Sequence, residues 1–280
     1  MTEEKTGTAL FLKPTKTVVM ILLVLFLLAG VGVRLIDLTD LPLDFAATRQ
    51  LHSLIMARGY YYQMDTPETS ALPNYIRRFG INTGKAEPVI EPPIVEKLAA
   101  LTYRIIGKED ILVPRLYSIL FWVIGGIPLF LLARKFIPVT GAFAALALYL
   151  FNPVGAIASR SFQPDPLMVM CILWALYFQV RWAYNTSLKN AIFAGVFTGL
   201  AFFVKAPAVF FVGFTMVGLV LGNGIKRSLK DWHVYLMAAL SLLPAILFNV
   251  ISATVGGNAG AIFGARWFPN LFSDPKWYLS

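Results

Sequence analysis

Residues 111–133 read ILVPRLYSILFWVIGGIPLFLLA and contain a single charged side chain, Arg115. An apolar run of this length is typical of a helix that crosses a membrane. Six further runs with almost no charge lie on either side of it, at residues 17–33, 139–158, 166–183, 191–204, 207–221 and 234–253. The sequence therefore predicts an all-α polytopic membrane protein with about seven transmembrane helices.

The composition supports this fold class. Of the 280 residues, 58% are hydrophobic and 14% are charged, whereas soluble domains are nearer half apolar and a quarter charged. A soluble enzyme, a disordered tail and a disulfide-stapled secreted domain are excluded, and Cys171 is the only cysteine. The net charge is +9. The basic residues flank the apolar runs, so this charge indicates membrane topology and not nucleic-acid binding.

The positions of lysine and arginine predict the orientation. With seven spans and the N-terminus inside, ten basic residues fall inside and two, Arg160 and Lys205, fall in short outer loops. The ten are Lys5, Lys13, Lys16, Arg134, Lys135, Arg181, Lys189, Lys226, Arg227 and Lys230. The positive-inside rule then places residues 1–16 in the cytoplasm and a long loop, residues 34–110, on the outer face. The first run also resembles a signal peptide, but its length and the later spans favour an uncleaved anchor.

Residues 191–221 are interrupted by Lys205 and Pro207. Because proline breaks or kinks a helix, we expect two short spans joined by a tight turn. The 14 residues 191–204 cover about 21 Å as a helix, against a hydrocarbon core of about 30 Å. Lys205 is therefore expected below the headgroups in a cavity, unless flanking residues lengthen the helix. The alternative is that Lys205 snorkels to the outer headgroups.

The loop at residues 34–110 is expected to carry two interfacial amphipathic helices. The first follows Asp44 and covers residues 45–58. Its apolar stripe and its end are formed by Phe45, Thr48, Leu51, Leu54, Ile55 and Gly59. The second begins near Pro92-Pro93 and ends at Gly107. Residues 65–85, with Pro67, Pro73 and Gly84, are expected to form a loop.

Several charged positions are candidate site residues, although no soluble-enzyme motif and no metal-ligand pattern is present. Asp44 is either a helix N-cap or a general base at the outer side. Asp165 is either a cap before Pro166 or a site residue, and Arg160 is a candidate partner for it. Glu91 either favours a helix N-terminus by its charge or belongs to the site. His52 and His233 have no visible partner and are not expected to be catalytic.

Residues 199–207, GLAFFVKAP, resemble a recurring segment of bacterial membrane glycosyltransferases with the GT-C fold. These include protein mannosyltransferases, aminoarabinose transferases of lipid A and their lipopolysaccharide-modifying relatives. Three other segments are similar: Pro42-Leu43-Asp44, Glu91-Pro92-Pro93, and the connection from Asn152-Pro153 through Arg160 to Asp165. The order of parts is similar over nearly the whole chain. Residues 17–253 resemble the conserved transmembrane module, and residues 254–280 an outer segment that begins a further C-terminal part.

The resemblance implies transfer of a sugar from a polyprenyl-phosphate donor to a hydroxyl of a glycan, lipid or protein acceptor. The reaction would occur on the periplasmic or extracellular side of the plasma (inner) membrane, among membrane lipids. Asp44 would be the general base. Lys205, with Arg160 or the Arg77-Arg78 pair, would stabilise the lipid phosphate. No cofactor is certain. A divalent metal is left open, since Phe45 stands where the family often has a second acid.

Two other functions are weighed against this one. A transporter or lipid flippase is expected to show repeated halves and polar residues near the membrane midplane. No repeat is visible in this chain, and its polar residues are concentrated in one outer loop. A non-catalytic membrane remnant is the second alternative.

Overall fold

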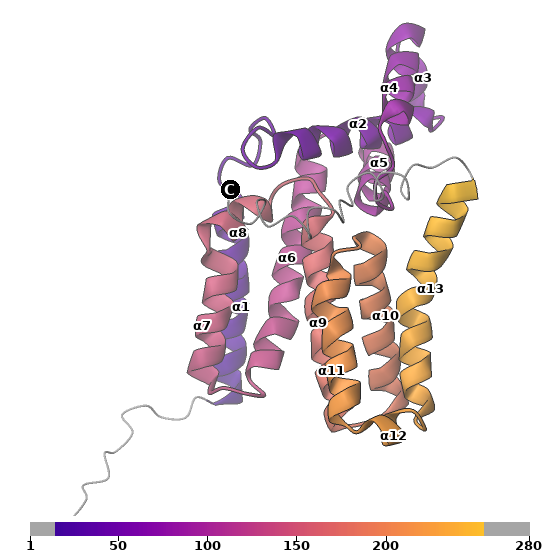
Figure 1. Cartoon of the computed structure of the whole chain (residues 1–280). Coiled ribbons are helices and arrows are strands. Elements are labelled where there is room, and N and C mark those ends of the chain that lie inside the picture. Colours follow the sequence, from indigo (N-terminus) through magenta and orange to yellow (C-terminus); the bar gives the residue numbers. More distant parts are fainter. Residues whose placement is uncertain (1–14, 255–280) are drawn as a thin grey trace, which may run out of the picture.

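The computed structural model describes the backbone of residues 15–254 and the side chains of residues 15–251. Within this range all regular secondary structure is helical and there is no β-strand, which confirms the predicted all-α class (Figure 1). The helices are α1 (Lys16–Arg34), α2 (Ala47–Gln63), α3 (Pro67–Ala71), α4 (Asn74–Ala86), α5 (Ile94–Ile106), α6 (Leu112–Ala133), α7 (Val139–Phe151), α8 (Pro153–Ala158), α9 (Asp165–Tyr184), α10 (Leu188–Val204), the π-helix η1 (Val209–Gly213), α11 (Phe214–Gly222), α12 (Ile225–Ser228) and α13 (Trp232–Thr254). The predicted outer segment after residue 254 lies outside the described residues.

The apolar helices stand side by side in one bundle (Figure 1). Four of them, α1, α6, α9 and α13, are long and apolar enough to cross a membrane. Three shorter apolar helices, α7, α10 and the continuous η1–α11, complete the bundle. Each of the seven predicted runs is thus helical over most of its length.

The outer surface of the bundle is apolar. Met20 and Leu28 on α1, and Leu243 and Leu247 on α13, are each more than half exposed. Large contiguous apolar patches are rare on soluble monomers. A membrane helix, in contrast, turns such a surface toward the lipid hydrocarbon. The exposure of these side chains is therefore that of a membrane protein.

Two of the predicted runs are broken by local structure. After α7, the side chain of Asn152 accepts the N–H groups of Val154 and Gly155 and starts α8. After α10, Lys205 is extended and η1 follows, so the predicted break at this position is confirmed. α10 begins at Leu188 and has 17 residues, or about 26 Å. The three residues before the predicted run therefore lengthen the helix, although it stays shorter than a hydrocarbon core of about 30 Å.

Helix α10 packs closely on α13 through two glycines four residues apart. A Cβ atom at Gly199 would lie 2.2 Å from the carbonyl oxygen of Leu240, and one at Gly195 would lie 2.9 Å from the Leu240 Cβ atom. Small residues at this spacing allow membrane helices to approach each other closely. The glycines therefore set the distance between α10 and α13.

The long loop contains four helices instead of the expected two. α2 lies across one end of the bundle with α5 beneath it, and α3 and α4 project beyond them (Figure 1). The prediction of a loop at residues 65–85 is wrong, because α3 and α4 occupy most of this range. A Cβ atom at Gly84 would lie 2.7 Å from the Gly59 Cα atom. Gly84 is thus a packing residue between α4 and α2, and it does not end a helix.

The two predicted loop helices have different outcomes. α5 begins after Pro93 and ends at Gly107, whose φ of 75° is left-handed, as predicted. α2 runs past the expected end to Gln63, and its predicted apolar stripe is only partly correct, since Leu54 packs against the core. Its buried residues include Gln50, Ser53, Met56 and Ala57, whereas Leu51 is exposed. The buried face of α2 is partly polar because it meets polar partners on α5 and on the α8–α9 connection.

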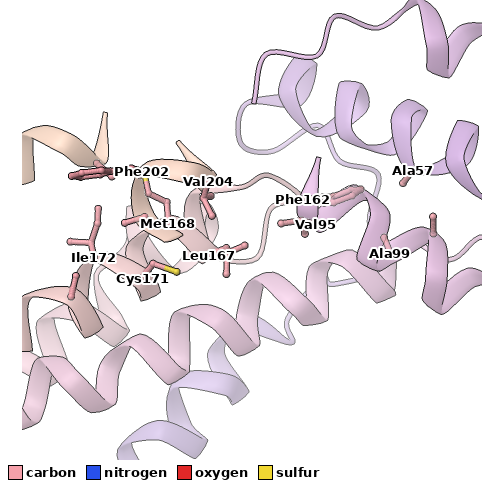
Figure 2. Packing of buried hydrophobic residues seen from close by; sticks show 14 of the residues in the cluster. Ala57, Val95, Ala99, Phe162, Leu167, Met168, Cys171, Ile172, Phe202 and Val204 are labelled. Carbon is pink, nitrogen blue, oxygen red and sulfur yellow. The ribbon is translucent and has the colours of Figure 1, made fainter. Parts of the chain in front are cut away.

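One apolar cluster joins the loop helices to the bundle. Figure 2 shows Phe162, from the connection between α8 and α9, beside Val95 and between Ala57 of α2 and Val204 of α10. Phe162 is 0% exposed. This packing fixes the α8–α9 connection against α2 and α5.

The helices alternate in direction, so their ends form two sets (Figure 1). The end of α1, the starts of α6 and α9 and the end of α10 lie where α2 and α5 cover the bundle; we call this the loop end. The opposite end carries α12 and the basic residues Lys16, Arg134, Arg181 and Lys226. The candidate residues Asp44, Glu91, Arg160, Asp165 and Lys205 all belong to elements at the loop end.

Candidate functional site

Asp44 lies in the segment between α1 and α2 and is bound by a side chain from far along the sequence. The Arg160 guanidinium donates from Nη2 and Nε to Asp44 Oδ2, at 2.9 and 3.2 Å. Arg160 also donates to the carbonyl oxygen of Ile36. The predicted pairing of Arg160 with Asp165 is therefore wrong, and Arg160 instead ties the α8–α9 connection to the segment after α1.

The alternative interpretation of Asp44 as a helix cap is wrong. The N-cap residue of α2 is Ala46, in a left-handed conformation with φ 48°, and no side chain caps this helix. The Asp44 carboxylate instead accepts from Gln50 Nε2 through Oδ1, at 3.2 Å. Asp44 therefore faces the end of the bundle, where two different partners hold its two oxygens.

These partners keep the Asp44 carboxyl ionised. Burial raises its pKa, but hydrogen bonds from Gln50, Arg160 and backbone N–H groups outweigh this and hold the pKa below its ordinary value. An ionised carboxylate only accepts hydrogen bonds. At neutral pH this group can thus take up a proton but has none to give.

Two buried arginines lie at the loop end, and one of them, Arg115, is close to Asp44. Arg115, 1% exposed, lies with Nη2 4.0 Å from Asp44 Oδ1 and donates from Nη1 to the carbonyl oxygen of Leu38. Arg34 donates to Ser159 and to the carbonyl oxygen of Gly30, and lies over the Trp122 ring. Among the described residues, Arg115 Nε and Arg34 Nη2 find no acceptor. Buried donors without a partner are costly and suit an anionic ligand.

Lys205 forms an ion pair with Asp165. Its Nζ atom donates to both oxygens of Asp165, at 2.9 and 2.8 Å. Asp165 is the first residue of α9 and makes no cap hydrogen bond, so its expected capping role is also wrong. The side chains of the pair are 24% and 34% exposed. Lys205 therefore remains accessible from the loop end, and an anion has to compete with Asp165 for its charge.

Glu91 belongs to a polar interface between α2 and the segment that includes α5. It is paired with Arg49 on α2, and one turn further Ser53 donates to the buried Glu96 at 2.8 Å. Burial raises the pKa of the Glu96 carboxyl, while the Ser53 hydrogen bond opposes this effect. His52 also has an acidic partner, Glu87, at 2.6 Å. These contacts hold α2 over the bundle and therefore support the position of Asp44 indirectly.

Arg77 and Arg78 lie on α4, at the other end of α2 from Asp44. Arg77 donates to the carbonyl oxygen of Tyr62 at 3.0 Å and lies 3.6 Å from Asp65, while Arg78 is exposed. Tyr62 and Gln50 are separated by about 18 Å along the axis of α2. The structure therefore brings together Asp44 and Arg160, and separately Lys205 and Asp165, and leaves Arg77 and Arg78 apart from both pairs.

The surroundings of Asp44 do not fit a metal site. Within the part of the chain that the structure describes, no three His, Cys, Asp or Glu side chains converge as metal ligands. The groups that face Asp44 are guanidinium and amide donors, whereas a cation needs acceptors. The cluster is thus a carboxylate surrounded by guanidinium and amide donors.

Three functional candidates are missing from the sequence-based prediction, namely Gln50, Arg115 and Arg34. For the two arginines a signal was available, because each lies in or next to an apolar run, where a charged residue is costly. Gln50 carries no such signal. Its importance comes from contacts with residues 44 and 162, which only the folded chain brings together.

Comparison with known proteins agrees with this architecture. The model of the family described as dolichyl-phosphate-mannose-protein mannosyltransferase matches residues 90–251, which is more than half of the chain. The match covers α5 to α13 with Glu91, Arg160, Asp165 and Lys205, and it begins after Asp44. Comparison with curated proteins and with solved structures gives no significant match. By the family match, the chain belongs to the dolichyl-phosphate-mannose-protein mannosyltransferase family of membrane glycosyltransferases.

Proposed function

We propose that this protein transfers a sugar from a polyprenyl-phosphate donor to an acceptor hydroxyl at the outer face of the plasma membrane. The observation that carries the proposal is the ionised Asp44 carboxylate, held at the loop end among Arg160, Arg115 and Gln50. A base beside guanidinium groups suits a reaction that deprotonates a hydroxyl and releases a phosphate. The acceptor class, whether glycan, lipid or protein, is left open by this observation.

In the proposed reaction, Asp44 accepts the proton of the acceptor hydroxyl as its oxygen attacks the anomeric carbon of the donor. The bond between that carbon and the phosphate oxygen breaks, and its electron pair leaves with the lipid phosphate. Attack from the side opposite the leaving group inverts the anomeric centre. Asp44 then returns the proton to solvent, from which it is partly accessible.

Lys205 and Arg160 are the proposed cations for the leaving phosphate. A phosphate monoester carries more negative charge than the diester of the donor, so cations at this position stabilise the product side of the reaction more than the substrate. Arg115, whose Nη2 atom lies 4.0 Å from Asp44 Oδ1 and whose Nε atom has no acceptor among the described residues, adds a third cation. Asp165 holds Lys205 before the donor binds, and Glu91 holds α2 through Arg49. A phosphate role for Arg77 and Arg78 stays a prediction.

The proposed topology has seven spans, with residues 1–16 in the cytoplasm and the loop end outside. It rests on the ten-to-two distribution of basic residues and on the bundle, in which the apolar helices stand side by side and alternate in direction. In this arrangement residues 17–253 form the transferase module. The ion pairs Asp44–Arg160 and Lys205–Asp165 both lie at the loop end, which favours a one-sided enzyme over a transporter with a midplane site.

The direct test is incubation of the purified protein, in nanodiscs, with radiolabelled polyprenyl-phosphate sugars and a mixture of glycan, lipid and peptide acceptors. We expect a labelled product of inverted anomeric configuration and release of polyprenyl phosphate. Donor analogues with a polyprenyl chain but no phosphate are the matched control and should give no product. Absence of both label transfer and phosphate release with every sugar tested would favour the non-catalytic alternative.

A further inference from the structure

Gln50 connects the two segments that form the Asp44–Arg160 pair. Its side chain is 0% exposed. Nε2 donates to Asp44 Oδ1 at 3.2 Å and to the carbonyl oxygen of Phe45 at 2.7 Å. Oε1 accepts the backbone N–H of Phe162 at 3.2 Å. One amide thus contacts both the segment before α2 and the α8–α9 connection.

We propose that Gln50 is a positioning residue that holds Asp44 in place beside Arg160 for proton transfer. The inference rests on the proposed function, in which Asp44 is the base. Gln50 contacts no reacting atom itself, and it acts through Asp44 on one side and through the backbone two residues after Arg160 on the other.

The chemistry of this position requires a glutamine amide. Two acceptor oxygens, from Asp44 and Phe45, lie on one side, and one N–H donor, from Phe162, lies on the other. An amide supplies both a donor group and an acceptor oxygen. The reversed amide orientation would face its N–H groups to the Phe162 N–H and its oxygen to two acceptors. The network therefore permits a single orientation of the side chain.

The surrounding packing keeps both contacts of Gln50 fixed. Phe162 is anchored in the apolar cluster between the loop helices and the bundle (Figure 2). One turn along α2, Ser53 is hydrogen-bonded to Glu96 on α5. Neither α2, which carries Gln50, nor the α8–α9 connection can then move without breaking buried contacts.

The charged groups near Asp44 come from three elements. Arg160 lies on the α8–α9 connection and Arg115 on α6. Asp40, on the same segment as Asp44, interacts electrostatically with Arg115. Gln50 is uncharged, and the hydrogen bond that it donates to Asp44 favours the ionised form of that carboxyl. Loss of that bond should raise the pKa of Asp44 while the charges of the site stay unchanged.

The test compares Q50A and Q50E with Q63A, a variant of an exposed glutamine on the same helix. Q50E keeps an acceptor for the Phe162 N–H but places a second carboxylate beside Asp44, so the two share a proton and titrate at higher pH. We expect the acid limb of the pH–rate profile to move up by about 0.5–1 pH unit in Q50A, since Asp44 is partly screened by solvent. The limb should move further in Q50E and stay in place in Q63A.

A merely structural role predicts a different result. Activity would then fall in proportion to the fraction of folded protein at every pH, with the acid limb unmoved, and this outcome would overturn the inference. If Q50A does not fold, Q50E still decides the question, because it retains the bond to the α8–α9 connection.

A second measurement needs no substrate. The carboxyl band of Asp44 can be titrated by infrared spectroscopy of the purified protein and assigned by its loss in D44N. A band that titrates at higher pH in Q50E supports the inference even if no donor is turned over. In that case the proposed function is wrong, but the positioning role of Gln50 is not. A band that titrates as in the wild type overturns the inference, even if the wild type transfers sugar.

Discussion

Asp44 combines a lowered pKa with partial exposure, and this combination limits what it can do. The carboxylate is ionised at neutral pH, so it is ready to take a proton before any substrate arrives. Its two oxygens already hold Arg160 and Gln50, and an acceptor hydroxyl has to approach along the remaining lone pairs. The chemistry proposed for the protein therefore depends on one side chain in a nearly fixed position.

Asp44→Asn should abolish most transfer while the protein remains folded. The amide is similar in size and still offers an oxygen to Arg160, but it cannot act as a base. We expect a loss of about 10²–10⁴-fold in kcat/KM, the usual contribution of general base catalysis. Transfer assays with a melting curve for each protein give the comparison. A variant within about threefold of the wild type would remove Asp44 from the mechanism.

Lys205→Met should weaken donor binding, and the Lys205–Asp165 pair makes a second variant necessary. The single change leaves the Asp165 carboxylate without its cation, so a loss of stability can accompany the loss of binding. Lys205→Met with Asp165→Asn removes both charges and should recover the stability but not the affinity. We expect polyprenyl phosphate to bind about ten- to a hundredfold more weakly in both proteins, as for a lost charge-assisted hydrogen bond.

Binding to nanodiscs, measured with polyprenyl phosphate and with the uncharged polyprenol, separates charge from lipid affinity. Polyprenol should bind equally to the wild type and to both variants. Unchanged binding of polyprenyl phosphate in the double variant would assign Lys205 a structural role only, as the partner of Asp165.

At the scale of helices, the apolar runs predict the bundle well because burial in hydrocarbon leaves few alternatives to a helix. The loop helices are predicted less well. Residues 74–86 contain Gly80 and Gly84, which suggest a break in an isolated sequence, yet they form α4 because α2 packs directly on them. The buried face of α2 is missed for a related reason. Gln50 and Ser53 are polar, and only their partners, Phe162 and Glu96, show why they face inward.

The candidate site shows the same limit. Asp44, Arg160, Asp165 and Lys205 are each detectable as charges near apolar runs, but their pairing is not. The chain places Arg160 near Asp165 in sequence, whereas the fold pairs it with Asp44, 116 positions away. The bend of the α8–α9 connection decides this choice, and it is set by the packing of Phe162.

Gly199→Ala should destabilise the contact between α10 and α13. The added Cβ atom would lie 2.2 Å from a backbone oxygen, so one helix has to shift. We expect a loss of about 1–3 kcal/mol, the range for overpacked sites. Gly218→Ala on α11 is the matched control, since a Cβ atom there meets nothing within 4 Å. Thermal denaturation in detergent should lower the melting temperature of the first variant alone, and equal melting temperatures would contradict the packing role of Gly199.

At the scale of the whole molecule, the proposed orientation can be tested with single cysteines. Asn82→Cys on α4 and Lys230→Cys after α12 lie at exposed positions on opposite ends of the bundle. Cys171 is buried and should give little background labelling. A membrane-impermeant maleimide added to intact cells should label residue 82 and not residue 230. Labelling of residue 230 from outside would reverse the topology and place the candidate site in the cytoplasm.

The link between Asp44 and Arg160 also has a consequence for biogenesis. A ribosome completes the segment that bears Asp44 long before it reaches residue 160, and the helices α6, α7 and α8 are made in between. During this interval the carboxylate lacks its guanidinium partner, and Gln50 lacks the N–H of Phe162. The nascent protein therefore completes the proposed site late, after several helices have been made. On the proposed mechanism, a chain stalled before that point would occupy the membrane without reacting with donor lipids.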